Sequence, residues 1–439
     1  MKVHFVGING SGASGVAIAA AKMGFQVSGC DHSADTPYSA QIAGAGIPVI
    51  IGHDAAHVDD ADIVTASPAL TTQSENIPEI AAAAAAGKLM KWQEFLGKYI
   101  LPGRKLIAVC GTHGKTTTSA MVAHILEYAG LDPTAFIGAI VPAWNSSNRF
   151  GASDWTVLEA DEYANNFESY RPQITILNNL EMEHPEYFRD YEHYKKTFRD
   201  FLANATGMLI YNADDAGVLE VIDSFSGEKI PFSIHGIKIT ADANGQSFDG
   251  FEIKLLGVHN VSNAMAAISV ARKVGINDDI IRDALSCFRG TGHRLEKVYE
   301  STKITIYDDY AHHHTQAKKT IEALRASYPD ARLTVVYEPH QISRYTQNTV
   351  DTLAGLSVAD MVFIMEFWRG RESNLSLPDV TADIERFGAK NIRYIPNTDE
   401  VLAVALSDAH STSGKSVILV MGAGASWKIA KRLKEELEI

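Results

Sequence analysis

Residues 105–118 read Lys-Leu-Ile-Ala-Val-Cys-Gly-Thr-His-Gly-Lys-Thr-Thr-Thr, an apolar run followed by a glycine-rich turn. The apolar run is typical of a buried strand, and the periodic apolar residues of Met121–Leu126 indicate a helix after the turn. In such a unit the glycines let the backbone wrap a phosphate, and amides at the helix N-terminus point at it. Lys115 supplies a positive charge and Thr116 a hydroxyl for Mg²⁺. The strict pattern would have glycine where this chain has Val109, so we predict a shortened phosphate loop that binds ATP.

Length and charge limit the classes of function that remain. With 439 residues, the chain is long enough for about three domains of roughly 150 residues each. Its formal net charge of −14 argues against a nucleic-acid or membrane-surface partner, although a local phosphate site remains compatible with it. No apolar run approaches the roughly 20 residues of a membrane-spanning helix, and the first residues do not read as a signal peptide. We therefore expect a cytoplasmic enzyme.

The three cysteines are Cys30, Cys110 and Cys287. They lie far apart in the sequence and are odd in number, so their spacing indicates neither a disulfide framework nor a metal cage.

The N-terminal segment has the pattern of a second nucleotide-binding unit. A strand at Val3–Val6 is followed by a glycine-rich turn at Gly7–Gly15, and a strand at Gln26–Cys30 ends at Asp31. This order of glycines and a later acidic residue resembles the dinucleotide fingerprint, with a lengthened turn. A site for NAD, a site for a diphosphate sugar and simple helix packing all remain compatible with it.

Acidic residues and a histidine follow two further apolar strands. Trp155–Leu158 precedes Glu159, and Thr175–Leu177 precedes a segment that contains His184. The carboxyl ends of parallel strands are where ligands bind in open α/β sheets. With the hydroxyl of Thr116, these two side chains could form part of a Mg²⁺ shell. The alternative is that both are solvated loop residues, and we favour the metal-binding interpretation.

The last part of the chain again alternates strands with helical stretches, which predicts a third parallel α/β unit. A strand at Lys303–Tyr307 precedes Asp308-Asp309 and the histidine run His312–His314. Later strands are expected at Leu333–Tyr337, Met361–Met365 and Val417–Val420. We do not interpret the three histidines as a zinc site, because no cysteines or His-x₃-His spacing accompany them. A histidine loop near a substrate and an inert loop both remain open.

The three units together predict an α/β protein of three domains. The N-terminal domain (1–98) and the C-terminal domain (294–439) are expected to be Rossmann-like. The central domain (99–293) is expected to be an ATPase domain of the P-loop type.

Several short motifs occur in an order that resembles the Mur ligase family, the ATP-dependent enzymes that build the peptide of bacterial peptidoglycan. The motifs are Gly111–Thr118, Glu159–Glu162, Glu183–His184, His259–Asn263, Gly290–Arg294 and Asp308–His313. Within the family, Gly7–Gly15, Glu159–Glu162 and Glu338–Arg344 are similar to the members that join L-alanine to UDP-N-acetylmuramate. The resemblance therefore implies ATP, UDP-N-acetylmuramate and L-alanine as substrates and Mg²⁺ as cofactor.

The resemblance also implies a role for individual residues. ATP is expected to contact Gly111, Thr112, His113, Gly114, Lys115, Thr116, Thr117, Asn260, Asn263, Arg294 and Asp309. The UDP-sugar is expected at Gly10, Ser11, Gly12 and Asp31, and the amino acid at His313, His340 and Arg344. The catalytic residues would be Lys115, Glu159, His184 and Arg294, of which Glu159 and His184, together with Thr116, would hold the metal.

Three positions depart from the family pattern, and all lie in the C-terminal unit. His314 stands for the usual proline, Gln341 for an arginine, and Ala425 for an aspartate. These departures leave the identity of the amine substrate open. A different relative, which attaches murein tripeptide to the same sugar nucleotide, is more similar in two segments, Asp161–Tyr163 and Ile176–Glu181. Two further classes of function compete with a ligase, namely an NAD-dependent oxidoreductase and a non-catalytic nucleotide-binding protein.

Overall fold

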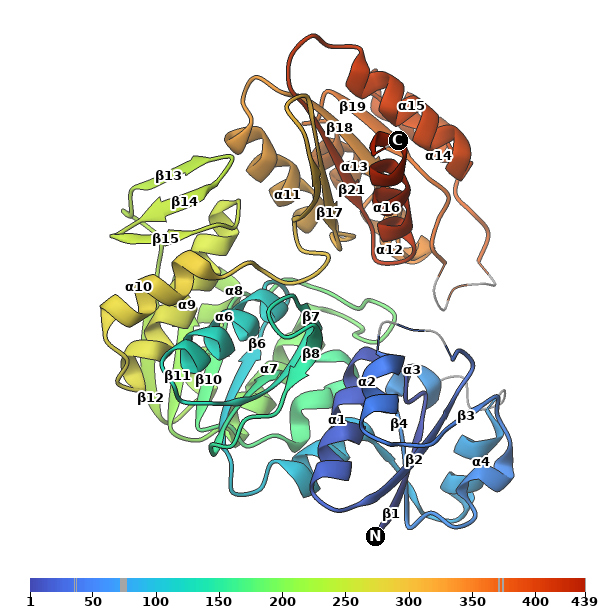
Figure 1. Ribbon diagram of the computed structural model, residues 1–439, viewed down its shortest axis with the longest axis vertical. Coiled ribbons are helices and arrows are strands. Elements are labelled where there is room, and N and C mark those ends of the chain that lie inside the picture. Colours follow the sequence, from blue (N-terminus) through green and yellow to red (C-terminus); the bar gives the residue numbers. More distant parts are fainter. Residues whose placement is uncertain (35, 37, 72–76, 370–371, 373–374, 439) are drawn as a thin grey trace. The chain divides into compact units, whose positions relative to one another are not determined.

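The computed structural model describes the chain except residues 35, 37, 72–76, 370–371, 373–374 and 439 (Figure 1). The described residues form two compact units. One consists of Met1–His235 and Asn263–Ala284, and the other of Gly236–Ser262 and Leu285–Ile439.

The first unit begins with a fully parallel sheet whose strand order is β3-β2-β1-β4-β5. Its strands are β1 (Lys2–Val6), β2 (Gln26–Asp31), β3 (Val49–Ile51), β4 (Ile63–Ala66) and β5 (Leu89–Lys91). The helices between and after them are α1 (Ser11–Lys22), α2 (Ser39–Gly44), the 3₁₀ turn η1 (Ala55–Val58), α3 (Pro68–Thr71), α4 (Pro78–Ala85), α5 (Trp92–Phe95) and the π-helical turn η3 (Leu96–Ile100). The strand order reverses beside β1, so the turn after β1 lies at the switch point where open sheets bind ligands.

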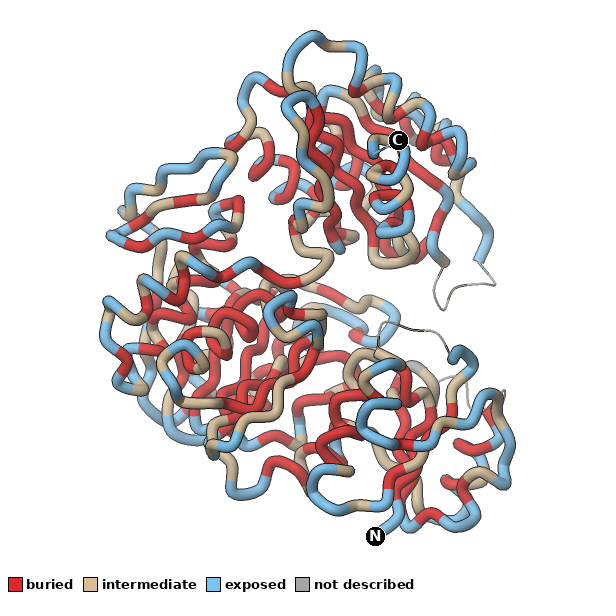
Figure 2. Tube along the Cα trace, in the orientation of Figure 1, coloured by how far each residue is buried: buried red, intermediate tan, exposed pale blue. Residues whose placement is uncertain are grey.

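The same unit contains a second sheet, with the order β12-β11-β10-β6-β9-β7-β8. Its strands are β6 (Lys105–Cys110), β7 (Thr134–Val141), β8 (Ser146–Arg149), β9 (Trp155–Glu159), β10 (Ile174–Leu177), β11 (Met208–Asn212) and β12 (Glu228–Phe232). They are parallel, except that the edge strand β8 runs antiparallel to β7. The central strand β6 is buried from Leu106 to Cys110 because helices cover both faces of a parallel sheet (Figure 2).

The helical segments that accompany this sheet are α6 (Lys115–Tyr128), η4 (Tyr163–Ser169), α7 (Tyr191–Asn204), α8 (Ala216–Leu219), η5 (Ile222–Ser224), α9 (Val258–Lys273) and α10 (Asp278–Cys287). The boundaries between the two compact units fall inside α9 and α10. Because β6 lies next to β9 and β10, the residues that follow these three strands meet at one edge of the sheet.

The second unit contains a small antiparallel sheet and a larger, mostly parallel one with the order β16-β17-β21-β18-β19-β20. The small sheet consists of β13 (Ile239–Asp242), β14 (Gly245–Phe248) and β15 (Phe251–Ile253). The larger sheet consists of β16 (Glu296–Glu300), β17 (Ile304–Asp309), β18 (Arg332–Tyr337), β19 (Met361–Ile364), β20 (Ile392–Tyr394) and β21 (Ser416–Met421), with β16 antiparallel at one edge. Its helices are α11 (His314–Ser327), α12 (Ile342–Gln347), α13 (Thr349–Leu356), α14 (Val380–Phe387), α15 (Thr398–His410) and α16 (Ser426–Leu437).

The predicted α/β class is confirmed, and most strand positions agree with the sequence to within one or two residues. The main difference is at β17, which includes the two acidic residues that we expected after the strand. Asp308 and Asp309 pair with Val420 and Met421 of β21, so the sheet continues through them. In the part of the chain that the structure describes, no helix combines the length and the apolar character needed to cross a membrane.

Candidate functional site

The turn between β6 and α6 has the backbone conformation of a phosphate loop. Gly111 has φ +125° and Gly114 has φ +79°, values that L-residues with side chains rarely adopt. A Cβ at Gly114 would collide with the side chain of Asn263 and would crowd that of Asn178. These two glycines are therefore required by the turn and by its close packing, and α6 begins directly after them at Lys115.

Lys115 lies inside this loop and is paired with a carboxylate. Its Nζ donates to Glu162 Oε2 at 2.8 Å, to Gly111 O at 2.7 Å and to Thr112 O at 3.2 Å. Burial by itself lowers the pKa of Lys115, but the carboxylates of Glu162 and Asp161 outweigh it and raise the pKa well above its usual value. The ammonium group is therefore permanently charged and held at the centre of the loop.

Thr116 and Glu159 form a second polar pair beside the lysine. Thr116 Oγ1 donates to Glu159 Oε1 at 2.9 Å, and Gly138 N donates to Glu159 Oε2 at 2.6 Å. The predicted proximity of this hydroxyl and this carboxylate is thus present. Both are hard oxygen donors of the kind that Mg²⁺ prefers, so the donor set fits that ion.

His184 lies in a neighbouring cluster. Its ligand atom and those of Asp161 and Glu162 all lie within 4.8 Å of one another. Burial lowers the pKa of His184, but Glu186 and Glu183 oppose this and the net shift is upward. His184 has φ +56°, a left-handed backbone conformation that residues with side chains rarely adopt. Such strained positions cluster at functional sites.

The loop is supported by residues that the sequence analysis did not single out. Asn179 accepts from Thr112 N through its backbone oxygen at 3.1 Å and from His113 N through Oδ1 at 2.7 Å. Tyr194 OH lies 2.9 Å from Thr112 Oγ1 and donates to Glu162 Oε1 at 3.1 Å. An Asn-Asn pair at the end of β10 was the available signal, whereas nothing in the sequence pointed to Tyr194 in the middle of α7.

The N-terminal glycine turn is built differently. A Cβ at Gly12 would collide with Trp92, and a Cβ at Gly15 would collide with Asn148, so these glycines allow α1 to pack closely. Asp31 Oδ2 accepts from Asn9 N at 2.9 Å and Oδ1 from Ser33 N at 3.2 Å. The carboxylate therefore fixes the turn that contains Gly10 and Ser11.

In the second unit, Arg294 and Asp309 come together. The Arg294 guanidinium lies over the ring of Tyr310, 4.8 Å from its centroid. Asp309 accepts from Leu295 N at 2.7 Å and from Ala311 N at 2.8 Å. Burial raises the pKa of Asp309 to about 6, although Arg294 opposes the shift. Asn260, at the start of α9, donates to Leu256 O at 2.8 Å.

The three residues predicted on the amino-acid side have different surroundings. Arg344 Nη1 lies 3.0 Å from His340 Nδ1, so these two form a pair. His313 caps α11, where its Nδ1 accepts from Thr315 N at 3.3 Å. The ring of His312 is 5.1 Å from the ring of His340.

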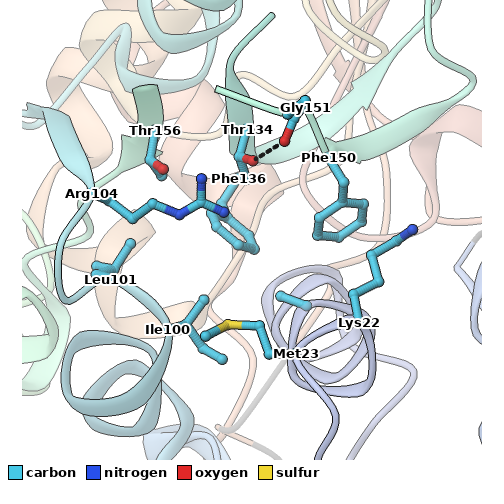
Figure 3. A pocket seen from close by; sticks show the side chains of 12 residues that line it. Lys22, Met23, Ile100, Leu101, Arg104, Thr134, Phe136, Phe150, Gly151 and Thr156 are labelled. Atoms are coloured by element: carbon cyan, nitrogen blue, oxygen red, sulfur yellow. Dashed lines mark hydrogen bonds between the residues drawn. The ribbon is translucent and has the colours of Figure 1, made fainter. Parts of the chain in front are cut away.

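A pocket of about 460 Å³ lies at the opposite end of the central sheet (Figure 3). It is lined by side chains that include Met23, Ile100 and Phe136, together with Thr134 and Thr156 near the beginnings of β7 and β9. The phosphate loop follows the carboxyl end of β6, so this pocket is separate from the candidate nucleotide site.

Comparison with known families covers most of the chain. Residues 2–101 match the model described as "Mur ligase family, catalytic domain". Residues 109–271 match "Mur ligase middle domain", and residues 293–424 match "Mur ligase, glutamate ligase domain".

Similar proteins extend over the same length. A UDP-N-acetylmuramate–L-alanine ligase of Hydrogenobaculum sp. is 33% identical over 450 residues, which cover 97% of this chain and 96% of that protein. The crystal structure of a UDP-N-acetylmuramate–alanine ligase of Thermotoga maritima has a TM-score of 0.82 at 26% identity, with 100% of this chain and 99% of that chain covered. A murein peptide ligase of Psychrobacter arcticus has a TM-score of 0.72 at 26% identity, with 100% and 98% covered.

Proposed function

The chain belongs to the Mur ligase family, and on that basis we propose that it is the ATP-dependent ligase that joins L-alanine to UDP-N-acetylmuramate. The observation that carries this proposal is its end-to-end similarity to ligases of that name. The murein tripeptide alternative is not favoured, because the two murein peptide ligase structures have lower TM-scores, 0.72 and 0.59 against 0.82.

The chemistry requires a poor electrophile to be activated. The lactyl carboxylate of UDP-N-acetylmuramate attacks the γ-phosphorus of ATP, the bond to the β–γ bridging oxygen breaks, and ADP leaves. The amine of L-alanine then attacks the acyl carbon of the acyl phosphate, a C–N bond forms, phosphate leaves, and the nitrogen loses a proton. The first step brings two anions together, so positive charge at the γ-phosphate is the main requirement.

We assign the supply of that charge to Lys115 and Arg294. Lys115 Nζ already uses its donors on Glu162 and two loop carbonyls, so a phosphate oxygen can replace one of these acceptors without moving the lysine far. Thr116 and Glu159 would hold Mg²⁺, with His184 nearby, and the ion would neutralise phosphate charge when bound. Gly111 to Thr117, Asn260, Asn263 and Asp309 complete the proposed ATP site.

We propose that the domains divide these tasks. Residues 1–98 bind the UDP-sugar through Gly10, Ser11, Gly12 and Asp31, and residues 99–293 bind ATP. Residues 294–439 bind the amino acid through His340 and Arg344, with His313 supporting the adjoining loop as a helix cap. Closure over the ATP site would exclude the water that hydrolyses acyl phosphates.

The test is an amine-specificity assay with the purified protein. Phosphate release from ATP should require both UDP-N-acetylmuramate and L-alanine, and mass spectrometry should detect the alanylated sugar nucleotide. If L-Ala-γ-D-Glu-meso-diaminopimelate supports faster turnover than L-alanine, the tripeptide alternative is correct. Release of phosphate from ATP that requires neither UDP-N-acetylmuramate nor an amine would contradict the ligase assignment.

A further inference from the structure

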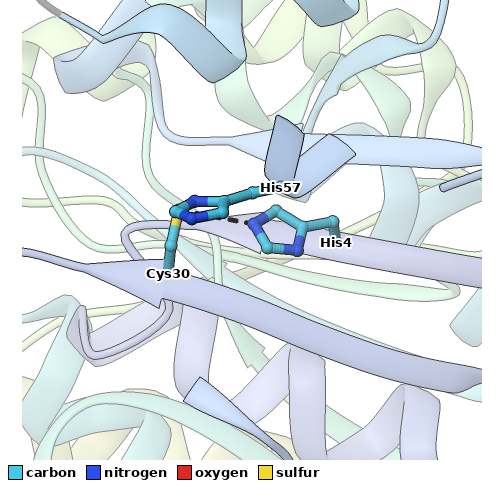
Figure 4. Close-up of side chains that lie close together, drawn as sticks. All are labelled: His4, Cys30 and His57. Carbon is cyan, nitrogen blue, oxygen red and sulfur yellow. Dashed lines mark hydrogen bonds between the residues drawn. The ribbon is translucent and has the colours of Figure 1, made fainter. Parts of the chain in front are cut away.

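A cluster of histidine, cysteine and glutamate side chains lies in the N-terminal sheet, and the proposed ligase reaction does not use it. Cys30 comes from β2, His53 from the loop after β3, His57 from η1 and Glu79 from α4. His4 on β1 adjoins Cys30, and Figure 4 shows the side chains of His4, Cys30 and His57 close together.

The side chains converge on one oxygen atom. Glu79 Oε1 lies 2.9 Å from His57 Nδ1, 3.1 Å from His53 Nδ1 and 3.3 Å from Cys30 Sγ. It also accepts from Asp54 N at 2.9 Å. A carboxylate oxygen has two lone pairs, so this oxygen is crowded by more polar atoms than it has lone pairs.

The other oxygen of the same carboxylate is in the opposite situation. Glu79 is fully buried, and among the described residues its Oε2 has no hydrogen-bond partner. A buried carboxylate without a compensating charge is unfavourable, and its orphaned oxygen adds to the penalty. A bound cation would supply the compensating charge.

Four of the six separations between the candidate ligand atoms can be compared with those of a tetrahedral zinc site. Zinc bonds of about 2.0–2.1 Å to nitrogen and 2.3 Å to sulfur place neighbouring ligand atoms about 3.3–3.6 Å apart. The separations here are 3.6 Å for Cys30 Sγ to His53 Nδ1 and 2.9–3.3 Å from Glu79 Oε1 to the other three atoms. These four separations differ from the zinc values by no more than a few tenths of an ångström.

We propose that Cys30, His53 and Glu79, whose ligand atoms lie within 4.8 Å of one another, bind a divalent transition-metal ion of the zinc type, and that His57 supplies the fourth ligand. The Cys30 thiol loses its proton to solvent on binding, and the thiolate and the carboxylate together carry two negative charges that balance the ion. His4 lies outside the set because its Nδ1 is 2.9 Å from Ser28 Oγ and its Nε2 contacts Cys30 Sγ, at 3.3 Å. It would instead orient the sulfur.

The position of the site indicates a structural role. Four ligands from four separate segments would tie β2, the loop after β3, η1 and α4 together, and none is exposed. The backbone oxygen of Cys30 also accepts from Gly7 N at 2.8 Å and from Ile8 N at 3.2 Å. The ion would therefore anchor the strand that holds the N-terminal glycine turn.

The first test measures the metal content of the full-length protein, expressed with zinc and dialysed against a weak chelator. One zinc per chain should remain in the wild type and in the matched control Cys287→Ser, whose cysteine is exposed and lies in the other unit. Cys30→Ser and Glu79→Gln should each lose it. A wild type without zinc, or a Cys30→Ser protein that keeps one equivalent, would overturn the proposal.

The second test needs no variant to fold. Metal-free wild-type protein is titrated with Co²⁺ in the absence of nucleotide. Binding at this site should give a thiolate-to-cobalt charge-transfer band and the strong visible bands of tetrahedral cobalt, which saturate at one equivalent. Oxygen ligands at the proposed Mg²⁺ site cannot produce the thiolate band, so its absence contradicts the proposal even if Co²⁺ binds.

Discussion

The turn at residues 7–15 and the turn at residues 111–118 both join a buried parallel strand to a helix, and both are rich in glycine. In the second turn Gly111 and Gly114 have positive φ, and the loop surrounds a charged lysine. In the first, Gly12 and Gly15 lie inside α1 and make room for Trp92 and Asn148. Gly7 also has a positive φ, of +74°, so the first turn uses glycine for backbone freedom as well as for close helix packing, whereas the second turn surrounds a cation.

The two turns also differ in the sign of the charged group that is associated with each. The second turn has a cation, Lys115, held by the buried Glu162. The first has an anion, Asp31, which binds the backbone of its own turn. A cation suits the phosphates of ATP directly, whereas a carboxylate can only shape a turn that offers backbone amides to a ligand.

The largest effect is expected from removing the cation. Lys115→Ala should lower kcat by about 10²–10³, because the positioned charge stabilises the transferring phosphoryl group. The rate of phosphate release with ATP, UDP-N-acetylmuramate and L-alanine measures it. The control is Lys196→Ala, which removes an exposed lysine paired with Asp200 on the surface of α7 and should leave the rate unchanged.

A double variant separates the loss of charge from a loss of structure. Lys115→Ala leaves Glu162 buried without its cation, which typically costs about 3–5 kcal/mol of stability. Lys115→Ala with Glu162→Gln should recover most of that stability, measured by chemical denaturation, and none of the activity. Recovery of turnover in the double variant would show that the lysine has only a structural role.

The next comparison exchanges a glycine for alanine in each turn. Gly15→Ala forces a Cβ into Asn148 and should destabilise the first unit by about 1–3 kcal/mol, with little change in KM for ATP. Gly114→Ala requires φ +79° from an alanine and pushes on Asn263, so it should raise KM for ATP strongly. Denaturation curves and ATP titrations measure the two effects. If the two variants changed KM for ATP equally, the two turns would not differ in their contribution to ATP binding.

Local patterns were enough to predict the class of fold and the phosphate loop. The run at 105–118 contains its own strand, turn and helix start, so β6, Lys115 and the nearby Thr116 follow from neighbours in the sequence. The pairing of Thr116 with Glu159 could also be anticipated, because parallel strands bring their carboxyl ends to one edge.

Other features depend on contacts between distant residues and have no local signal. Tyr194 reaches Glu162 from the middle of α7, and Glu79 meets Cys30 from a helix 49 residues away. The N-terminal glycines show that a local pattern can also be ambiguous. The glycines at 7–15 were compatible with a ligand-binding turn and with simple helix packing. The side chains opposite Gly12 and Gly15 show that both glycines allow close helix packing, and the proposed UDP-sugar contact at Gly12 stays a prediction.

A smaller effect is expected from the carboxylate of the first turn. Asp31→Asn replaces an acceptor for Asn9 N and Ser33 N by an amide whose NH₂ group faces one of these donors. A hydrogen bond to a charged acceptor contributes about 1.5–3 kcal/mol, so KM for UDP-N-acetylmuramate should rise about 10-fold. KM for ATP should stay constant and serves as the internal control. An unchanged KM for the sugar nucleotide would mean that this turn does not bind it.

The smallest effect is expected at Asp309, the last residue of β17. Asp309 shares one feature with Asp31 and another with Lys115. Like Asp31 it accepts backbone N–H groups, and like Lys115 it is buried beside an opposite charge, Arg294. Burial raises its pKa to about 6 in the folded protein from 3.8, so the folded state holds the proton more tightly than the unfolded state. The free energy of unfolding should therefore rise as pH falls from 7 to 5, by about 1 kcal/mol relative to Asp309→Asn, whose side chain does not titrate. Urea denaturation of both proteins at the two pH values measures the difference. Because Arg294 opposes the shift, Arg294→Ala should enlarge the pH dependence, and a decrease in that variant would show that burial is not its cause.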